Sequence, residues 1–263
     1  MLGPPPYNDV AANTRKDNSM REVTLLEMLQ KGVHFGHQEA RWNPKMKPFI
    51  FTSRNGVHIL NLEATLDKLK AAATFAESIV QAGGSILFVG TKRQVKAIVK
   101  KQAEAGGMPY MTERWIGGTL TNFTTIHELI KKLRRLKSEQ AAGLLDRYTK
   151  KEQVGLQKEI TKLQTEIGGI EQVDKIPQAL FVIDCAKERT AIREARAMNV
   201  PIIAICDTNV NPDLVQYPIP GNDDATKSVE LLTSVITESI NAGKQRQAAT
   251  NPAPAAVPAA VSI

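Results

Sequence analysis

The stretch "PQALFVIDCAKERTAIREARAMNVPIIAICDTN", residues 177–209, decides the fold. It contains two short, almost wholly apolar runs, 178–185 and 200–208, and between them a polar segment, 188–199, with helical periodicity. A short continuous apolar run indicates a strand that is buried on both faces. A strand, a helix and a second strand in this order favour a right-handed crossover within a parallel sheet.

The same alternation continues on both sides of this unit. Residues 85–91, "SILFVGT", form a third apolar run, and 108–115 are compatible with a further strand. The predicted helices cover 23–32, 62–81, 92–107, 188–199 and 226–243. We therefore expect an α/β fold with a mostly parallel sheet and helices on both of its faces.

One block, from about Leu120 to Ile167, interrupts this alternation. It has no strand pattern, and its apolar residues recur at alternating spacings of three and four, which predicts two helices with narrow apolar seams. They would be joined near residues 141–146 as an antiparallel hairpin, and Thr149 and Glu152 have the spacing of a capping box for the second helix. The seams consist of Phe123, Ile126, Ile130 and Leu133, and of Leu156, Ile160, Leu163 and Ile167.

The hairpin at 120–167 therefore divides the α/β domain into two segments, 20–119 and 168–243. Residues 1–19 are polar and non-periodic, and 244–263 form an Ala/Pro-rich low-complexity tail, so we expect both ends to be disordered. The chain has no apolar stretch of membrane-spanning length. Cys185 and Cys206 lie in apolar runs without CxxC spacing, so we expect both to be small buried side chains that stay reduced. We therefore expect a soluble intracellular protein.

The positive charge is concentrated in one region. The chain has 34 Lys and Arg against 27 Asp and Glu, a net charge of +7. Between Lys92 and Lys137 there are eleven cations and three Glu, a local excess of 11 − 3 = +8. A concentrated basic surface favours a polyanionic partner, because neutralised phosphates release condensed counterions.

Enzyme motifs are missing from the strand ends, where an open parallel sheet places its ligands. Neither the GxxxxGK[ST] nor the GxGxxG phosphate loop is present, and neither the GxSxG elbow nor the HExxH helix occurs. Asp184 and Asp207 follow predicted strands, and we expect them to cap the next turns. The alternatives left open are a small-molecule or nucleotide-binding α/β enzyme, and a protein-interaction scaffold that uses the hairpin.

A divalent metal site would draw on His37, Asp207 and one of Asp223 or Asp224, since imidazole and carboxylate ligands suit zinc and similar ions. No spacing in the sequence forces these residues together. We therefore expect no metal, and expect the histidines to hydrogen bond to backbone in a structured loop.

Two segments interleave cations with tryptophan. Residues 32–50, "GVHFGHQEARWNPKMKPFI", carry two prolines that we expect to stiffen an extended loop, and 113–123, "ERWIGGTLTNF", precede the basic helix 130–137. Cations pair with phosphates, and flat rings stack on exposed bases. The candidate RNA-binding residues are Arg41, Trp42, Lys45, Lys47, Arg54, Lys92, Arg93, Lys96, Arg114, Trp115, Lys131, Lys132, Arg134 and Arg135.

Several long stretches, in order along the chain from about Met20 to Gly243, resemble the bacterial form of the small-subunit ribosomal protein S-two family. Among them are "LLEMLQKGVHFGHQEARWNPKMKPFIF", "ILFVGTKRQ", "ERWIGGTLTNF" and "IPGNDDA". The resemblance implies a flavodoxin-like domain with an inserted coiled-coil hairpin. It also implies a non-enzymatic cytoplasmic protein, without cofactor, membrane or small-molecule substrate, that binds small-subunit ribosomal RNA near the head–body junction. A further implied partner is the messenger-binding ribosomal protein S-one, which the family helps to dock.

Overall fold

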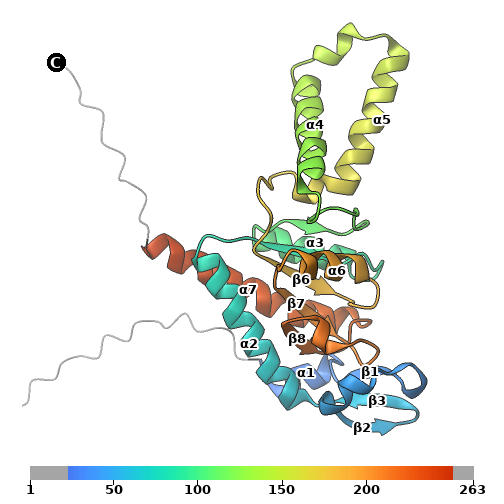
Figure 1. Cartoon of the computed structure of the whole chain (residues 1–263), viewed down its shortest axis with the longest axis vertical. Helices are drawn as coiled ribbons and strands as arrows, with labels where there is room; N and C mark the ends of the chain where they lie inside the picture. The colour runs from blue at the N-terminus through green and yellow to red at the C-terminus, as the bar shows by residue number, and fades with distance from the viewer. Residues whose placement is uncertain (1–22, 251–263) are drawn as a thin grey trace, which may run out of the picture.

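The computed structural model describes residues 23–250, and its centre is a parallel five-stranded sheet (Figure 1). The strand order is β5-β4-β6-β7-β8. Numbered by their order in the chain, these strands run 2-1-3-4-5, which is the order of flavodoxin-like sheets. The predicted α/β fold is confirmed. The strands are β4 (Ile86–Val89), β5 (Tyr110–Met111), β6 (Ala179–Ile183), β7 (Ile202–Cys206) and β8 (Tyr217–Pro220).

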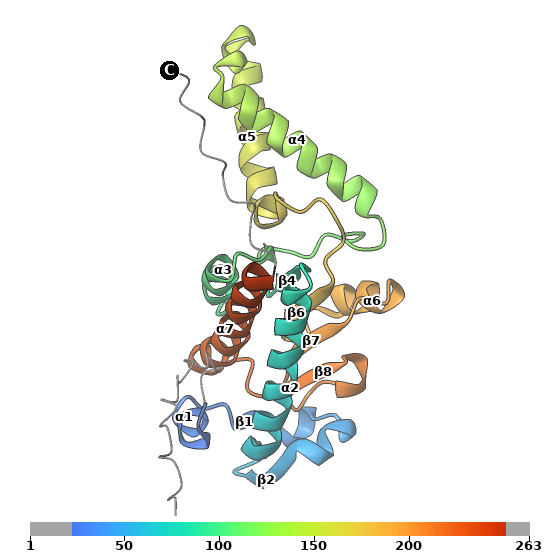
Figure 2. The same ribbon diagram turned by 90° about the vertical axis from the view of Figure 1, so that its left-hand side faces the viewer.

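Helices cover both faces of this sheet (Figure 2). Every residue of β4, β6 and β7 is buried, as expected for strands between two helical layers. Phe88 and Phe181 contribute to the core on one face, together with α2, α3 and α7, whereas Leu87 and Leu180 contribute to the core on the α6 face. The helices are α1 (Leu25–Gln30), α2 (Leu62–Gln81), α3 (Lys96–Ala105), α6 (Arg189–Ala197) and α7 (Thr226–Thr250).

Two long helices, α4 (Phe123–Ala141) and α5 (Lys150–Ile167), stand at one end of the molecule (Figure 1). They are connected by the short 3-10 helix η3 (Leu144–Arg147), and the apolar residues at their centres belong to the core of the α6 face. The predicted capping box is present, because Thr149 N donates to Glu152 Oε2 at 2.9 Å. Both helices lie where the sequence predicts them, while their winding as a coiled coil stays a prediction. After α5 comes the 3-10 helix η4 (Gly168–Ile170).

A small antiparallel sheet lies at the end opposite the hairpin (Figure 1), and the sequence did not predict it. Its strands are β1 (Phe35–Gln38), β2 (Ile50–Arg54) and β3 (Val57–Leu60), in the order β1-β3-β2. Asn55 and Gly56, with φ of 55° and 74°, form the tight turn between β2 and β3. The expectation of an extended loop over residues 32–50 is therefore wrong for this segment. It contains β1 and the 3-10 helices η1 (Glu39–Arg41) and η2 (Pro44–Phe49), where Pro44 suits the first helical position.

The ends of the described chain differ slightly from expectation. Helix α7 continues to Thr250, whereas the sequence predicts its end at Gly243. Strand β8 was not predicted, and it follows the 3-10 helix η5 (Pro212–Leu214). The disorder predicted for 244–263 is therefore wrong for 244–250, which belong to α7. The disorder predicted for 1–19 and for 251–263 lies outside the described residues. Within 23–250, no helix is both long and apolar enough to cross a membrane.

Candidate functional site

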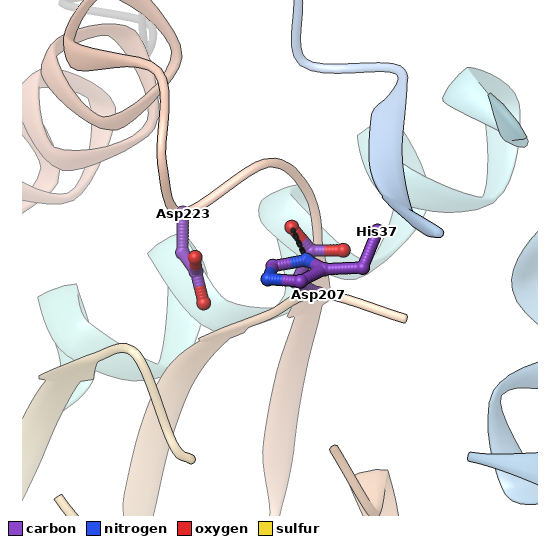
Figure 3. A group of neighbouring side chains, drawn as sticks. All are labelled: His37, Asp207 and Asp223. Carbon is purple, nitrogen blue, oxygen red and sulfur yellow. Dashed lines mark ion pairs between the residues drawn. The ribbon is translucent and has the colours of Figure 1, made fainter. Parts of the chain in front are cut away.

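Charged side chains from four strand ends meet at the carboxyl edge of the large sheet. Figure 3 shows three residues of this cluster, His37, Asp207 and Asp223. His37, on β1, places its Nδ1 atom 2.9 Å from Asp207 Oδ2, just after β7. Lys92, which follows β4, places its Nζ atom 3.3 Å from Asp184 Oδ2 and 3.0 Å from Asp223 Oδ1. The small sheet thus positions His37 over the edge of the large one.

The strand-end aspartates also hold the turns that follow them. Asp184 Oδ1 accepts a hydrogen bond from Lys187 N at 3.0 Å, and Asp207 Oδ1 accepts one from Thr208 N at 2.5 Å. The predicted capping role is confirmed for Asp184, which accepts from an N–H group three residues later, whereas Asp207 accepts from the adjacent Thr208. Because these turns are fixed, the carboxylates are held in place at the sheet edge.

The crowding of carboxylates changes the protonation of the cluster. Burial, followed by repulsion from Asp184 and Asp207, raises the pKa of Asp223 to about 7. The hydrogen bond to Asp207 raises the pKa of His37. Burial lowers the pKa of Lys92, but its pairing with Asp224 and Asp223 outweighs this and raises the pKa overall. Near neutral pH the cluster therefore holds a proton that titrates on Asp223.

The same residues could hold a divalent metal ion. His37, Asp207 and Asp223 each offer one ligand atom, and these atoms lie within 4.8 Å of one another. Among residues 23–250, Asp223 Oδ2 is buried and has no hydrogen-bond partner. One imidazole and two carboxylates suit zinc or a similar ion. The expectation that His37 hydrogen bonds to backbone is wrong, because its ring faces Asp207. His37, Asp207 and Asp223 are possible ligands from the sequence alone, but no spacing in the sequence requires them to converge.

The switch point between β4 and β6, where a flavodoxin-like sheet binds its ligand, is filled with carboxylates. Thr91 N and Thr91 Oγ1 both donate to Glu188 Oε1, at 3.0 and 2.5 Å. A backbone amide that could hold a phosphate is thus already bound to an anion, and Asp184 adds a second negative charge nearby. This arrangement disfavours the nucleotide-binding alternative, since a bound phosphate would be repelled. The charge of Lys92 is neutralised by the carboxylates of this cluster.

Five of the other eleven candidate cations also have carboxylate partners. Lys96 pairs with Glu113 at 2.5 Å, and Arg134 pairs with Asp174 at 2.9 Å. Lys45, Lys132 and Arg135 pair with Asp213, Glu159 and Glu139 respectively. Within the described part of the chain, the candidates that are exposed and without an ion pair are Arg41, Lys47, Arg54, Arg93, Arg114 and Lys131.

The two tryptophans have different environments. Trp42 is 37% exposed, and its ring centroid lies 5.2 Å from that of His58. Trp115 is only 7% exposed, and its Nε1 atom donates to Glu194 Oε1 at 3.0 Å. Trp115 therefore packs in the core and has no free face for a base, while Trp42 retains an exposed edge.

Three arginines that the sequence analysis did not select lie on the exposed face of α6. Arg189, Arg193 and Arg196 line a cavity of about 650 Å³, and Asn43 and Asn209 are among its other lining residues. Their spacing of four and three residues places them on one side of a helix. That periodicity, readable in "RTAIREAR", is the signal that could have identified them.

Comparison with known proteins gives a consistent result. The family model described as Ribosomal protein S2 matches residues 28–243. A protein of Mycolicibacterium vanbaalenii named small ribosomal subunit protein uS2 is 48% identical over 241 residues, covering 92% of this chain and 88% of that protein. A protein of the same name from Mycobacteroides abscessus is 49% identical over 226 residues, covering 86% of this chain and 82% of that protein.

Proposed function

The chain belongs to the ribosomal protein S2 family, and from this premise we propose that it is a structural component of the small ribosomal subunit. In this role it binds small-subunit ribosomal RNA near the head–body junction, in the cytoplasm. The family is one of structural proteins rather than enzymes. The observation that carries the proposal is the family match over 28–243, which spans the α/β domain and the hairpin together.

The distribution of free charge supports an RNA surface at the small sheet and its loops. Arg41 and Arg54 are exposed, and no ion pair holds them within the described residues. Such cations can take a phosphate without first leaving a carboxylate, and the exposed edge of Trp42 lies next in the chain to Arg41. Recognition would follow RNA shape and backbone, because a folded RNA hides its major-groove edges.

Two finer elements complete the proposal. The helices α4 and α5 form a coiled coil that carries Lys131 and its basic neighbours toward RNA, as the alternating spacing of the buried Ile126, Ile130 and Leu133 suggests. The protein also helps to dock the messenger-binding ribosomal protein S-one. This second partnership rests on the family resemblance.

Sedimentation of a tagged copy in a lysate, through sucrose gradients at low and high salt, tests the proposal. We expect co-migration with small subunits at low salt. Substitution of Arg41→Glu with Arg54→Glu should reduce it, because like charges then face the phosphates. A matched control is Lys68→Glu with Lys70→Glu, two exposed cations of α2 that lack ion pairs within residues 23–250. Recovery of the unaltered chain only at the top of the gradient, with ribosomes intact, would refute the proposal.

A further inference from the structure

The cavity beside α6 lies at the carboxyl ends of β6 and β7, on the face of the sheet opposite α2 and α7. Its walls come from α6, from the segments that follow the two strands, and from Asn43 in the loop after β1. A volume of about 650 Å³ is in the range of pockets that hold small molecules or single nucleotides. The cavity is separate from the acidic cluster at the switch point.

The charge of the cavity wall is entirely positive. Arg189, Arg193 and Arg196 are exposed, and among residues 23–250 none of them has an ion pair. No Asp or Glu lines the cavity. The basic helix α4, by contrast, has four of its cations paired with carboxylates. A row of arginines that no carboxylate neutralises selects an anionic occupant.

One polar group of the residues that line the cavity also lacks a partner. Asn209 Oδ1 is buried and has no hydrogen-bond donor among the described residues. A buried acceptor without a donor costs free energy, which a ligand bearing an N–H group would recover. Asn43 and Asn211 also line the cavity, but their Oδ1 atoms already accept from Lys45 N and Asp213 N, which leaves their NH₂ groups as donors. Ile192 and other apolar residues complete the lining. Carboxamides and an apolar wall are suited to the edge and the face of a nucleobase.

We propose that this cavity receives one unstacked nucleotide of the ribosomal RNA. Its base enters against Ile192 and Asn209, and the flanking phosphates lie along the arginines of α6. The inference rests on the proposed function and adds a specific site to it. It predicts that the RNA is single-stranded at this contact, since a paired base could not leave its helix without cost.

The arginine row favours a nucleic-acid chain over a single phosphate. From Arg189 to Arg196 the helix rises about 10 Å, at 1.5 Å per residue, which is longer than one phosphate group can span. An acidic peptide would also satisfy the charge. It would not, however, explain the unpartnered Asn209 Oδ1 atom beside an apolar lining, which favours a heterocycle that carries an N–H group.

The test is filter binding of the full-length purified chain to small-subunit ribosomal RNA over a series of KCl concentrations. The cavity variant is Arg189→Gln with Arg193→Gln and Arg196→Gln. Its control is Lys68→Gln with Lys70→Gln and Lys227→Gln, three exposed cations on the opposite side of the sheet. Relative to the control, the cavity variant should reduce the slope of log affinity against log salt by about 2, from three phosphates at about 0.7 each.

Two further measurements test the entry of a base. Asn209→Leu should weaken binding about two- to tenfold at every salt concentration without changing the slope, because it removes one hydrogen bond and no charge. RNA carrying 4-thiouridine and 6-thioguanosine should cross-link on irradiation to the tryptic peptide 197–227, which contains Asn209.

The outcomes separate this inference from the proposed function. If the unaltered chain binds RNA and sediments with small subunits, but the cavity variant behaves as its control, the cavity is not an RNA site. A slope change without an Asn209 effect or a cross-link means phosphate contact alone and overturns base entry. If the cavity variant keeps its RNA affinity but no longer sediments with small subunits, an acidic protein segment is the occupant. If the unaltered chain binds no RNA and stays at the top of the gradient, the proposed function fails as well.

Discussion

The carboxylate of Glu194 holds the glycine-rich loop that leads into the hairpin, and its replacement should be severely destabilising. Its Oε1 atom accepts hydrogen bonds from Trp115 Nε1 at 3.0 Å and Gly118 N at 2.9 Å. Its Oε2 atom accepts from Leu120 N at 3.1 Å and, at 3.4 and 3.3 Å, from Thr121 N and Oγ1. Burial raises the pKa of Glu194, but these donors together hold it below its ordinary value. The group is thus a buried anion in a ring of donors.

The cost of Glu194→Gln follows from these contacts. Glutamine keeps one oxygen and replaces the other with NH₂, so at least two of the five donors then face another donor. With each unsatisfied buried donor costing about 1–3 kcal/mol, we expect the free energy of unfolding to fall by about 4 kcal/mol.

Urea unfolding, followed by tryptophan fluorescence, measures this change directly, since Trp115 is one of the donors. The control is Glu128→Gln on the exposed face of α4, which should stay within about 0.5 kcal/mol of the unaltered chain. A loss below about 1 kcal/mol for Glu194→Gln would refute the argument that the carboxylate organises this loop. In that case the turn geometry around Gly118, whose φ is 89°, would hold the loop by itself.

Three further predictions concern the acidic cluster and the hairpin. The pKa of Asp223 is about 7 in the folded chain and near 3.8 in an ordinary carboxyl, so the folded state binds more protons and stability should fall as pH rises from about 4 to 7. Asp223→Asn mimics the protonated acid, so its free energy of unfolding should exceed that of the unaltered chain by up to about 4 kcal/mol at pH 8 and by nothing near pH 4. Urea titrations in the presence of a chelator measure this difference, and a difference that does not change with pH would contradict the prediction. If the cluster binds a divalent ion, excess Zn²⁺ should raise the Tm, and His37→Ala should abolish that rise; an equal Tm with and without Zn²⁺ would exclude binding. Thr149→Ala should cost about 1 kcal/mol and speed amide exchange in the first turn of α5, and unchanged exchange would show that the capping box is unimportant.

The sequence predicts the centre of the fold better than its edges. Strands β4, β6 and β7 are buried on both faces, so their apolar runs have no polar interruption and are readily recognised. Strand β8 was missed because "YPIP" contains two prolines, which normally argue against a strand. At β8 they are tolerated, because β8 is an edge strand that pairs only with β7.

The small sheet could have been predicted from its turn. Asn55 and Gly56 lie between "FTSR" and "VHIL", and an Asn-Gly pair between strand-forming residues is a strong hairpin signal. The density of charge and proline over 32–50 favoured a loop instead. What no local pattern could supply is the placement of β1 against β3, since Phe35 pairs with Ile59 across an intervening 3-10 segment.

The site differs most from the sequence prediction because ion pairing is a tertiary property. Arg134 pairs with Asp174, forty residues later in the chain, and Lys92 pairs with Asp223, 131 residues later. A dense cationic run such as 131–137 therefore says little about which charges remain available. Each paired cation must leave its carboxylate before it can bind a phosphate, so it contributes less to RNA affinity than an unpaired one. By this argument the sparse arginines of α6 should contribute more per residue than the denser cations of α4.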